Sequence, residues 1–207
     1  MPLDLADLVR PERCAVVTSE IQSGVVGERS ALPELAAAAG PMVEAVARLC
    51  AAARTAEVAV VHCTAARRAD GRGSNANARL FAGVRKSPVA LLPGSSEASV
   101  VPELGPEPSD LVLNRLHGLS PMAGTDLDPV LRNLGVTTIV VTGVSVNVAV
   151  TNLVMDAVNL GYQVVLPRDG VTGIPADYAE SMIDGTLALL ATVTAIDDVI
   201  EAWGAAR

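Results

Sequence analysis

Short apolar runs rich in Val and Ile alternate along the chain with longer runs rich in Ala and Leu. The short β-branched runs predict six strands, at Cys14–Ser19, Val58–Cys63, Asp110–Asn114, Thr138–Gly143, Gln163–Leu166 and Thr192–Ala195. The longer amphipathic runs predict helices at Met42–Thr55, Asp126–Leu134, Val146–Leu160, Ala176–Leu190 and Ile196–Trp203.

The predicted strands lack the alternation of apolar and polar residues that a half-exposed sheet has. Such strands are buried on both faces, as in a parallel sheet with helices on each side. Regular alternation of strands and helices also implies right-handed crossover connections. The pattern therefore predicts an α/β fold with three α/β/α layers around a six-stranded, mostly parallel sheet.

One long segment, Arg67–Pro108, interrupts this alternation. It is rich in Gly, Ser, Pro and Asn, and its one short apolar piece is Val89–Leu92. A connection of this length is uncommon in a compact domain unless it has a function, so we expect it to cover a site or an interface. Its basic residues Arg67, Arg68 and Arg72 are either a grip for an acidic ligand or, as is more usual, a solvated surface.

Composition narrows the class of protein. The 207 residues suit one domain, residues 1–207, and 50% of them are hydrophobic but only 2% aromatic. The core must therefore consist mainly of Ala, Val, Leu and Ile. The 15 basic and 23 acidic residues give a formal net charge of -8. This charge argues against a nucleic-acid partner, because binding to phosphates needs clustered Lys and Arg.

The cysteines and the first residues bear on location. Cys14, Cys50 and Cys63 are odd in number and form no CxxC pair, which favours buried free thiols in a reducing, cytoplasmic compartment. The segment Met1–Glu12 has no basic stretch followed by an apolar run, so it does not resemble a signal peptide. The apolar stretches look too short and too interrupted to span a bilayer, and we expect no membrane partner.

Polar residues follow several of the predicted strands. In open α/β sheets, ligands bind beyond the carboxyl ends of the strands. The candidate site residues are therefore Glu20, Gln22, His62, Arg115, His117 and the segment Ser145–Ala149.

Three of these residues are candidate catalytic groups. Glu20, at the tip of a buried strand, is partly desolvated and suits acid or base chemistry; the alternative is a surface Glu that caps an amide. Arg115 would bind a carboxylate or a developing anion, and His117 would supply a proton near neutral pH. The alternatives are a surface Arg and a half-buried structural His.

Two further residues are candidates for substrate binding. Gln22 is expected to orient a ligand or the Glu20 carboxylate, or else to bond within its loop. His62 lies inside a strand end, and its alternative is a core histidine with satisfied hydrogen bonds. His62 and His117 are the only histidines, so no zinc ligand set is visible and we expect no metal.

Four stretches resemble the isochorismatase-like cysteine hydrolase family. That family has Asp-x-Gln after its first strand, a Ser-x-Phe-x-Gly-Thr-x-Leu segment, a strand, turn and helix that carry the nucleophile, and Asp-Ala-x-x-x-Gly-Tyr. The matching stretches are Ser19–Gln22, Ser120–Asp128, Val141–Val150 and Asp156–Tyr162. The resemblance covers Cys14 to about Ala195 and implies a Rossmann-like isochorismatase-type hydrolase fold.

The family's catalytic set is an Asp, a Lys and a Cys, and all three positions differ here. The Asp position holds Glu20, which keeps a carboxylate. The Lys position falls on Leu116, although Arg115 could restore a positive charge from beside it. The Cys position holds Ala149, which has no nucleophilic atom. Family members without the cysteine hydrolyse a vinyl ether with the carboxylate as general acid.

The turn before the family's nucleophile carries a cis peptide and offers backbone amides to an oxyanion. By the resemblance, Val144, Ser145, Asn147 and Ala149 would bind substrate, with the cis peptide between Val144 and Ser145. Ser145 has the alternative role of a helix N-cap.

The sequence thus predicts a hydrolase without a cysteine nucleophile that acts on a small amide, imide or enol ether. The alternative is an inactive relative that binds a ligand or serves as a scaffold. A nucleotide-binding module is unsupported, because the glycines after the first strand do not form G-x-G-x-x-G. We expect no cofactor and, from the resemblance, a homo-oligomer (dimer or tetramer).

Overall fold

A six-stranded sheet organises the protein, described in this computed structural model for residues 4–205. The expected domain, 1–207, also includes residues 1–3 and 206–207, which lie outside the described range. The strand order is β3-β2-β1-β4-β5-β6, and all five pairings are parallel. The strands are β1 (Cys14–Ser19), β2 (Ala59–Ala65), β3 (Leu111–Arg115), β4 (Thr138–Gly143), β5 (Gln163–Pro167) and β6 (Thr192–Thr194).

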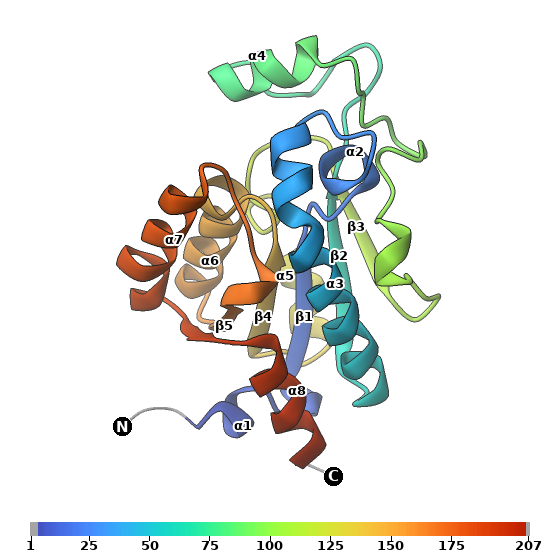
Figure 1. The fold of residues 1–207 in the computed structure, drawn as a ribbon. Helices are drawn as coiled ribbons and strands as arrows, with labels where there is room; N and C mark the ends of the chain where they lie inside the picture. The colour runs from blue at the N-terminus through green and yellow to red at the C-terminus, as the bar shows by residue number, and fades with distance from the viewer. Residues whose placement is uncertain (1–3, 206–207) are drawn as a thin grey trace.

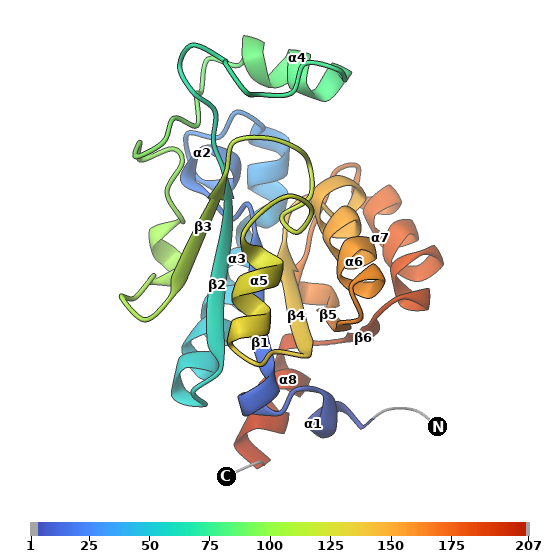
Figure 2. The ribbon, with the colours of Figure 1, turned by 180° about the vertical axis from the view of Figure 1, so that it is seen from behind.

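Helices cover both faces of this sheet, which confirms the three-layer prediction (Figures 1 and 2). One face carries α1, α2, α3 and α8, and the other carries α5, α6 and α7. The α-helices are α1 (Leu5–Leu8), α2 (Ser23–Val26), α3 (Pro33–Thr55), α4 (Arg79–Lys86), α5 (Leu127–Asn133), α6 (Thr151–Asn159), α7 (Ala176–Gly185) and α8 (Ile196–Ala205). The short turns are η1 (Pro11–Arg13), η2 (Pro102–Leu104), η3 (Val146–Val150), η4 (Arg168–Gly170) and η5 (Leu187–Leu189).

The side chains of alternate residues on each inner strand pack into two separate hydrophobic cores, one on each face of the sheet. On β1, Val16 belongs to the core under α3 and α8, whereas Val17 belongs to the core under α5 and α6. Both side chains are fully buried. The sequences of these strands are unbroken apolar runs because both faces of the sheet are covered by helices.

The longest helix differs from its prediction. A start after Gly40–Pro41 was expected, since proline favours the first turn of a helix. Instead α3 begins at Pro33 and contains Pro41 in its interior. Its buried positions run without a break from Leu35 and Ala39 through Met42 and beyond, so burial of this stripe outweighs the hydrogen bond that Pro41 removes.

Three other segments differ from the prediction by more than two residues. The helix expected at 146–160 opens with one π-helical turn, η3, before α6. The helix expected at 176–190 ends at Gly185, and the 3-10 turn η5 follows it. The long segment 67–108 contains a helix, α4, that was not predicted. This helix lies above the sheet, at the opposite end of the molecule from α1 and α8 (Figure 1).

Because of its early start, α3 has 23 residues and is long and apolar enough, by composition, to cross a membrane. The prediction that every apolar stretch is too short was therefore wrong for this helix. Its most apolar window is 44% buried inside the protein, and its apolar stripe packs on the sheet. A core helix of a globular protein can have the same length and apolar composition.

His62 lies in the core beneath α3, away from the candidate site, in place of the predicted ligand contact. Its Nδ1 lies 2.9 Å from Thr18 Oγ1 and its Nε2 3.3 Å from Asp110 Oδ2. Arg54 of α3 donates two hydrogen bonds to the same carboxylate, at 2.7 and 3.1 Å. These polar groups therefore satisfy one another inside the protein, which is the structural role given above as the alternative.

This buried network predicts that acid destabilises the protein near neutral pH. Burial lowers the pKa of His62 below its usual 6.5, although Asp110 opposes the shift. In the unfolded chain His62 therefore binds a proton near pH 6.5, whereas in the folded protein it does so only at a lower pH. The free energy of unfolding thus decreases as the pH falls through this range. Urea unfolding from pH 7.5 to 5.5 should show a loss of at most about 1.4 kcal/mol per pH unit.

The two histidines provide a matched pair of variants for this measurement. His62→Gln should flatten the pH dependence, whereas His117→Gln, which alters an exposed side chain, should leave it as in the unmodified protein. An equal slope in both variants would contradict the assignment.

Candidate active site

The carboxyl ends of four neighbouring strands are tied together by backbone hydrogen bonds. The amide of Glu20, just after β1, donates to Cys63 O of β2 at 2.9 Å. The amide of Val144, just after β4, donates to Ser19 O at 3.0 Å, and Ala66 N donates to Arg115 O at 2.9 Å. Residues from distant parts of the sequence therefore meet at one edge of the sheet, as open α/β sheets require of a ligand site.

Gly143 allows the turn after β4 to approach β1 this closely. It has a φ of +111°, and a Cβ placed there would lie 2.1 Å from Ser19 O. No other residue fits without moving one of the strands. The adjoining peptide between Val144 and Ser145 is cis, as the resemblance implied.

An ion pair between Glu20 and Arg115 joins the end of β1 to the end of β3, across β2. Glu20 has a left-handed backbone with a φ of 55°, which a non-glycine residue rarely adopts. The Arg115 side chain is 6% exposed and that of Glu20 21%. Arg115 Nη2 also donates to Leu119 O at 3.2 Å, but its Nε and Nη1 are buried without a partner.

Beyond this pair lies a cavity of about 370 Å³. Its floor consists of residues from the strand ends and the η3 turn: Glu20, Arg115, Val144, Ser145, Val148 and Ala149. One wall comes from α2 and the start of α3, including Val25, Leu32 and Leu35. The cavity is open space above the floor, not a volume filled by packed side chains.

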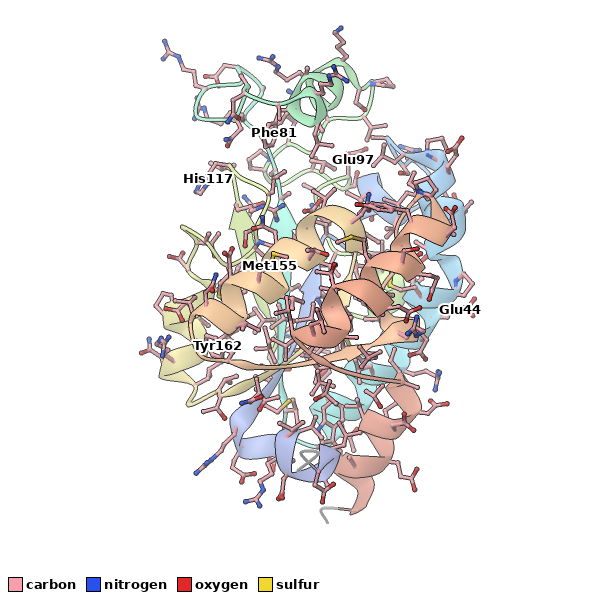
Figure 3. The ribbon with its side chains drawn as sticks, turned by 90° about the vertical axis from the view of Figure 1, so that its left-hand side faces the viewer. Glu44, Phe81, Glu97, His117, Met155 and Tyr162 are labelled. Atoms are coloured by element: carbon pink, nitrogen blue, oxygen red, sulfur yellow. The ribbon has the colours of Figure 1, made fainter. Side chains whose placement is uncertain are left out.

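The long segment 67–108, which was expected to cover a site or an interface, supplies the roof of the cavity. Leu80, Phe81 and Val84 of α4 line the cavity, as do Val89 and Leu91 beyond it. In Figure 3, Phe81 lies on the side of α4 that faces the rest of the molecule. Sequence reasoning missed this helix, although the apolar spacing of residues 80, 81 and 84 between arginines could have revealed it.

Gln22 supports the site from outside the cavity. Its Nε2 donates to Ala65 O at 2.9 Å and to Ala98 O at 2.7 Å, and its Oε1 accepts from Ala65 N at 2.8 Å. The side chain is fully buried and joins the end of β2 to the roof segment. It therefore takes the loop-bonding role that was the alternative to ligand binding.

The predicted turn residues divide into two groups. Val144, Ser145 and Ala149 line the cavity. Asn147 does not: its Nδ2 lies 3.5 Å from Ile174 O, on the side of η3 that faces Gly173. Asn147 therefore packs against the segment after η4, in place of the predicted substrate contact.

The rim of the cavity comes from the chain after β3. His117 and Leu116 both line it, and both are exposed. Figure 3 shows His117 at this upper rim, beyond the ends of the strands. The amide of Gly118 donates to Asn75 Oδ1 of the roof segment at 2.8 Å, which connects the rim to the roof.

The basic cluster of the long segment is split by the structure. Arg67 lines the cavity. Arg68 is exposed and paired with Asp70 at 2.7 Å, and Arg72 is exposed outside the cavity. Arg68 and Arg72 therefore belong to a solvated surface, whereas only Arg67 has the position that binding of an acidic ligand would need.

Comparison with known proteins agrees with this geometry. Residues 14–198 match the Isochorismatase domain family. The chain belongs to the isochorismatase family. A cysteine hydrolase from Pseudomonas syringae pv. phaseolicola has a similar structure, with a TM-score of 0.85 and 25% identity over 100% of this chain and 97% of that one.

Two curated relatives of this isochorismatase-family chain are ureidoacrylate amidohydrolases named RutB. The protein from Pseudomonas savastanoi pv. phaseolicola is 30% identical over 154 residues, which cover 68% of this chain and 62% of that protein. The protein from Methylobacterium radiotolerans is 35% identical over 136 residues, which cover 59% and 52%. The chain thus matches between half and two thirds of the length of these relatives.

None of the three cysteines lines the cavity. Burial raises the pKa of Cys14, Cys50 and Cys63 to about 12 each. Cys14 begins β1, at the opposite end of the sheet from Glu20. Ala149, which lines the cavity, offers only a methyl group. Within residues 4–205, no group of three or more His, Cys, Asp or Glu side chains is arranged to hold a metal ion.

The raised pKa values predict inert thiols. Iodoacetamide at about pH 8 alkylates a thiolate, so mass spectrometry should find all three cysteines unmodified in the folded protein and modified in concentrated guanidinium chloride. Alkylation of native Cys63 at the rate of a free thiol would contradict this expectation.

Proposed function

We propose that this isochorismatase-family protein hydrolyses a small molecule by proton transfer at the Glu20 carboxylate, without a cysteine nucleophile. One observation carries the proposal. The Glu20 carboxylate lines a cavity at the carboxyl edge of a parallel sheet, where Arg115 holds it, and none of the three cysteines lines this cavity.

Arg115 has the role of fixing the carboxylate and of offering charge to a developing anion. In the turn before the helix, the amides of Val144 and Val146 already donate to Ser19 O and Thr172 O. The Ser145 amide is therefore the candidate donor to an oxyanion. His117, on the rim, is a candidate for proton exchange with solvent.

An enol ether is the substrate type whose hydrolysis needs the fewest catalytic groups, because it requires a proton donor and water but no nucleophile from the protein. Protonated Glu20 would give its proton to the terminal carbon, and water would add to the resulting oxocarbenium carbon. Glu20 would take back a proton from that water, and the hemiketal would break down to a carbonyl compound and an alcohol.

Amide hydrolysis is the reaction named for the RutB relatives. Here Glu20 would take a proton from a water molecule while the oxygen of that water adds to the carbonyl carbon of the amide. The proton would then pass to the leaving nitrogen as the C–N bond breaks. An imide would follow the same steps.

A ligand-binding protein without activity is the second candidate. It is favoured by Leu116 and Ala149, which stand at the positions of the family's Lys and Cys. The open cavity supports either ligand binding or chemistry and weighs against a purely structural scaffold. A cytoplasmic location and a homo-oligomer stay predictions of the sequence.

The decisive variant for this proposal is Glu20→Gln, which keeps the size of the side chain and removes its ability to exchange a proton. Turnover of a panel of amides, imides and vinyl ethers, followed by mass spectrometry, should fall by at least about 100-fold. Cys63→Ser should retain full activity.

Two results would count against the proposal. Retained turnover in Glu20→Gln would remove the carboxylate from the mechanism, and loss of turnover in folded Cys63→Ser would restore a thiol mechanism. Absence of turnover by the unmodified protein on the whole panel, against a buffer control, would favour the ligand-binding alternative.

A further inference from the structure

We infer that the cavity selects a small anion, a carboxylate or a group of like charge and shape carried on an apolar body, and that Arg67 is the residue that recognises its charge. This inference deepens the proposed function, on which its description of the ligand as a substrate rests. The binding claim itself needs no turnover.

The charges that line the cavity are the first observation. Four arginines line it, Arg67, Arg79, Arg85 and Arg115, against one acid, Glu20. Four positive charges and one negative charge leave +3 around the cavity with His117 neutral, whereas the whole chain has a net charge of -8. A positive cavity in an acidic protein concentrates anions at its mouth and repels cations.

The second observation is a set of buried donors that the protein leaves unused. Arg67 Nε, Ser74 Oγ, and Arg115 Nε and Nη1 are buried without a hydrogen-bond partner, and all three residues line the cavity. Arg115 is only 7% exposed as a residue. Buried polar groups are nearly always paired in folded proteins, so donors left open beside a cavity indicate a ligand with acceptor oxygens.

Arg67 and Arg115 stand at the ends of adjacent strands. Ala65 of β2 is in register with Arg115 of β3, and Ala66 N donates to Arg115 O at 2.9 Å. Arg67 follows directly, with its own amide donating to Leu91 O of the roof at 2.8 Å. Arg115 is already paired with Glu20. Among residues 4–205, by contrast, no salt bridge joins Arg67 to an acid, so its charge is free for a ligand.

The rest of the lining describes the body of the ligand. Leu35, Phe81, Val89, Leu91 and Val148 surround the cavity. A volume of about 370 Å³ suits a molecule of roughly the size of a substituted ring or a short branched chain. The ligand is therefore a small amphipathic molecule with one charged end and an apolar remainder.

A pair of probes of equal shape tests this inference by binding alone. Benzoate carries a carboxylate on a planar ring, and nitrobenzene has nearly the same shape without net charge. Isothermal titration calorimetry with the unmodified protein should give benzoate at least roughly tenfold tighter binding than nitrobenzene, because the charge-assisted hydrogen bonds serve only the anion. Raised salt should weaken benzoate alone.

The neighbouring arginines provide matched variants. Arg67→Gln should weaken benzoate by roughly tenfold and leave nitrobenzene unchanged. Arg68→Gln removes the same charge one residue away, but from an exposed side chain paired with Asp70, and should change neither. Arg67→Lys should recover part of the benzoate affinity. Circular dichroism checks that each variant is folded.

Equal affinities for the two probes, or equal losses in Arg67→Gln and Arg68→Gln, would overturn the inference. The proposed hydrolysis can fail separately. Arg67-dependent benzoate binding without turnover would leave the anion site standing and remove the enzyme, whereas turnover indifferent to the charge of the substrate would do the reverse.

Discussion

A partly buried ion pair between Glu20 and Arg115 links two strands that are not neighbours, β1 and β3, at the edge of the sheet where the cavity opens. Two charges inside a protein are tolerated only if they are paired and held in good geometry. Several features of the fold serve this requirement. The register of β2 places Ala65 beside Arg115, and Glu20, which pairs with Arg115, has a left-handed backbone directly after β1.

The same constraint accounts for the surroundings of the pair. Gly143 lets the turn after β4 lie against Ser19, directly before Glu20. Gln22 uses its whole amide to join β2 to the roof segment, so the backbone beyond Glu20 is fixed on both sides. Arg115 donates from Nη2 to both Glu20 and Leu119, and its Nε and Nη1 are buried without a partner. The floor is therefore rigid and charged, whereas the walls above it are apolar and come from α3 and α4.

The sheet was accessible to sequence reasoning because its strands are short and buried on both faces. Such strands leave unbroken apolar runs, and β1 and β4 have the predicted bounds without change. The start of α3 was not accessible, because Pro41 is a local signal for a helix start and only the tertiary burial of Leu35 and Ala39 overrides it. The helix α4 was hidden for the opposite reason, since none of its residues is fully buried.

For the site, position after a strand pointed to Glu20, Arg115 and the turn at Val144–Ser145, which the structure brings together around one cavity. It could not tell which way a side chain points. His62 and Cys63 are consecutive, yet one faces the core under α3 and the other the core under α5. The sequence likewise contained no indication that the Gln22 side chain would form hydrogen bonds with three backbone groups of Ala65 and Ala98. Only the fold brings these residues together.

The measurement that most directly tests the central claim is a double-mutant cycle on the free energy of unfolding, with Glu20→Gln, Arg115→Met and the double variant. If the ion pair holds the floor together, the double variant should lose less free energy of unfolding than the sum of the losses in the two single variants. The coupling energy should then exceed about 1 kcal/mol, as for residues in direct contact within one network. Additivity within about 0.3 kcal/mol would contradict the account, because it would mean that the two side chains act independently and that the cavity does not depend on their pairing.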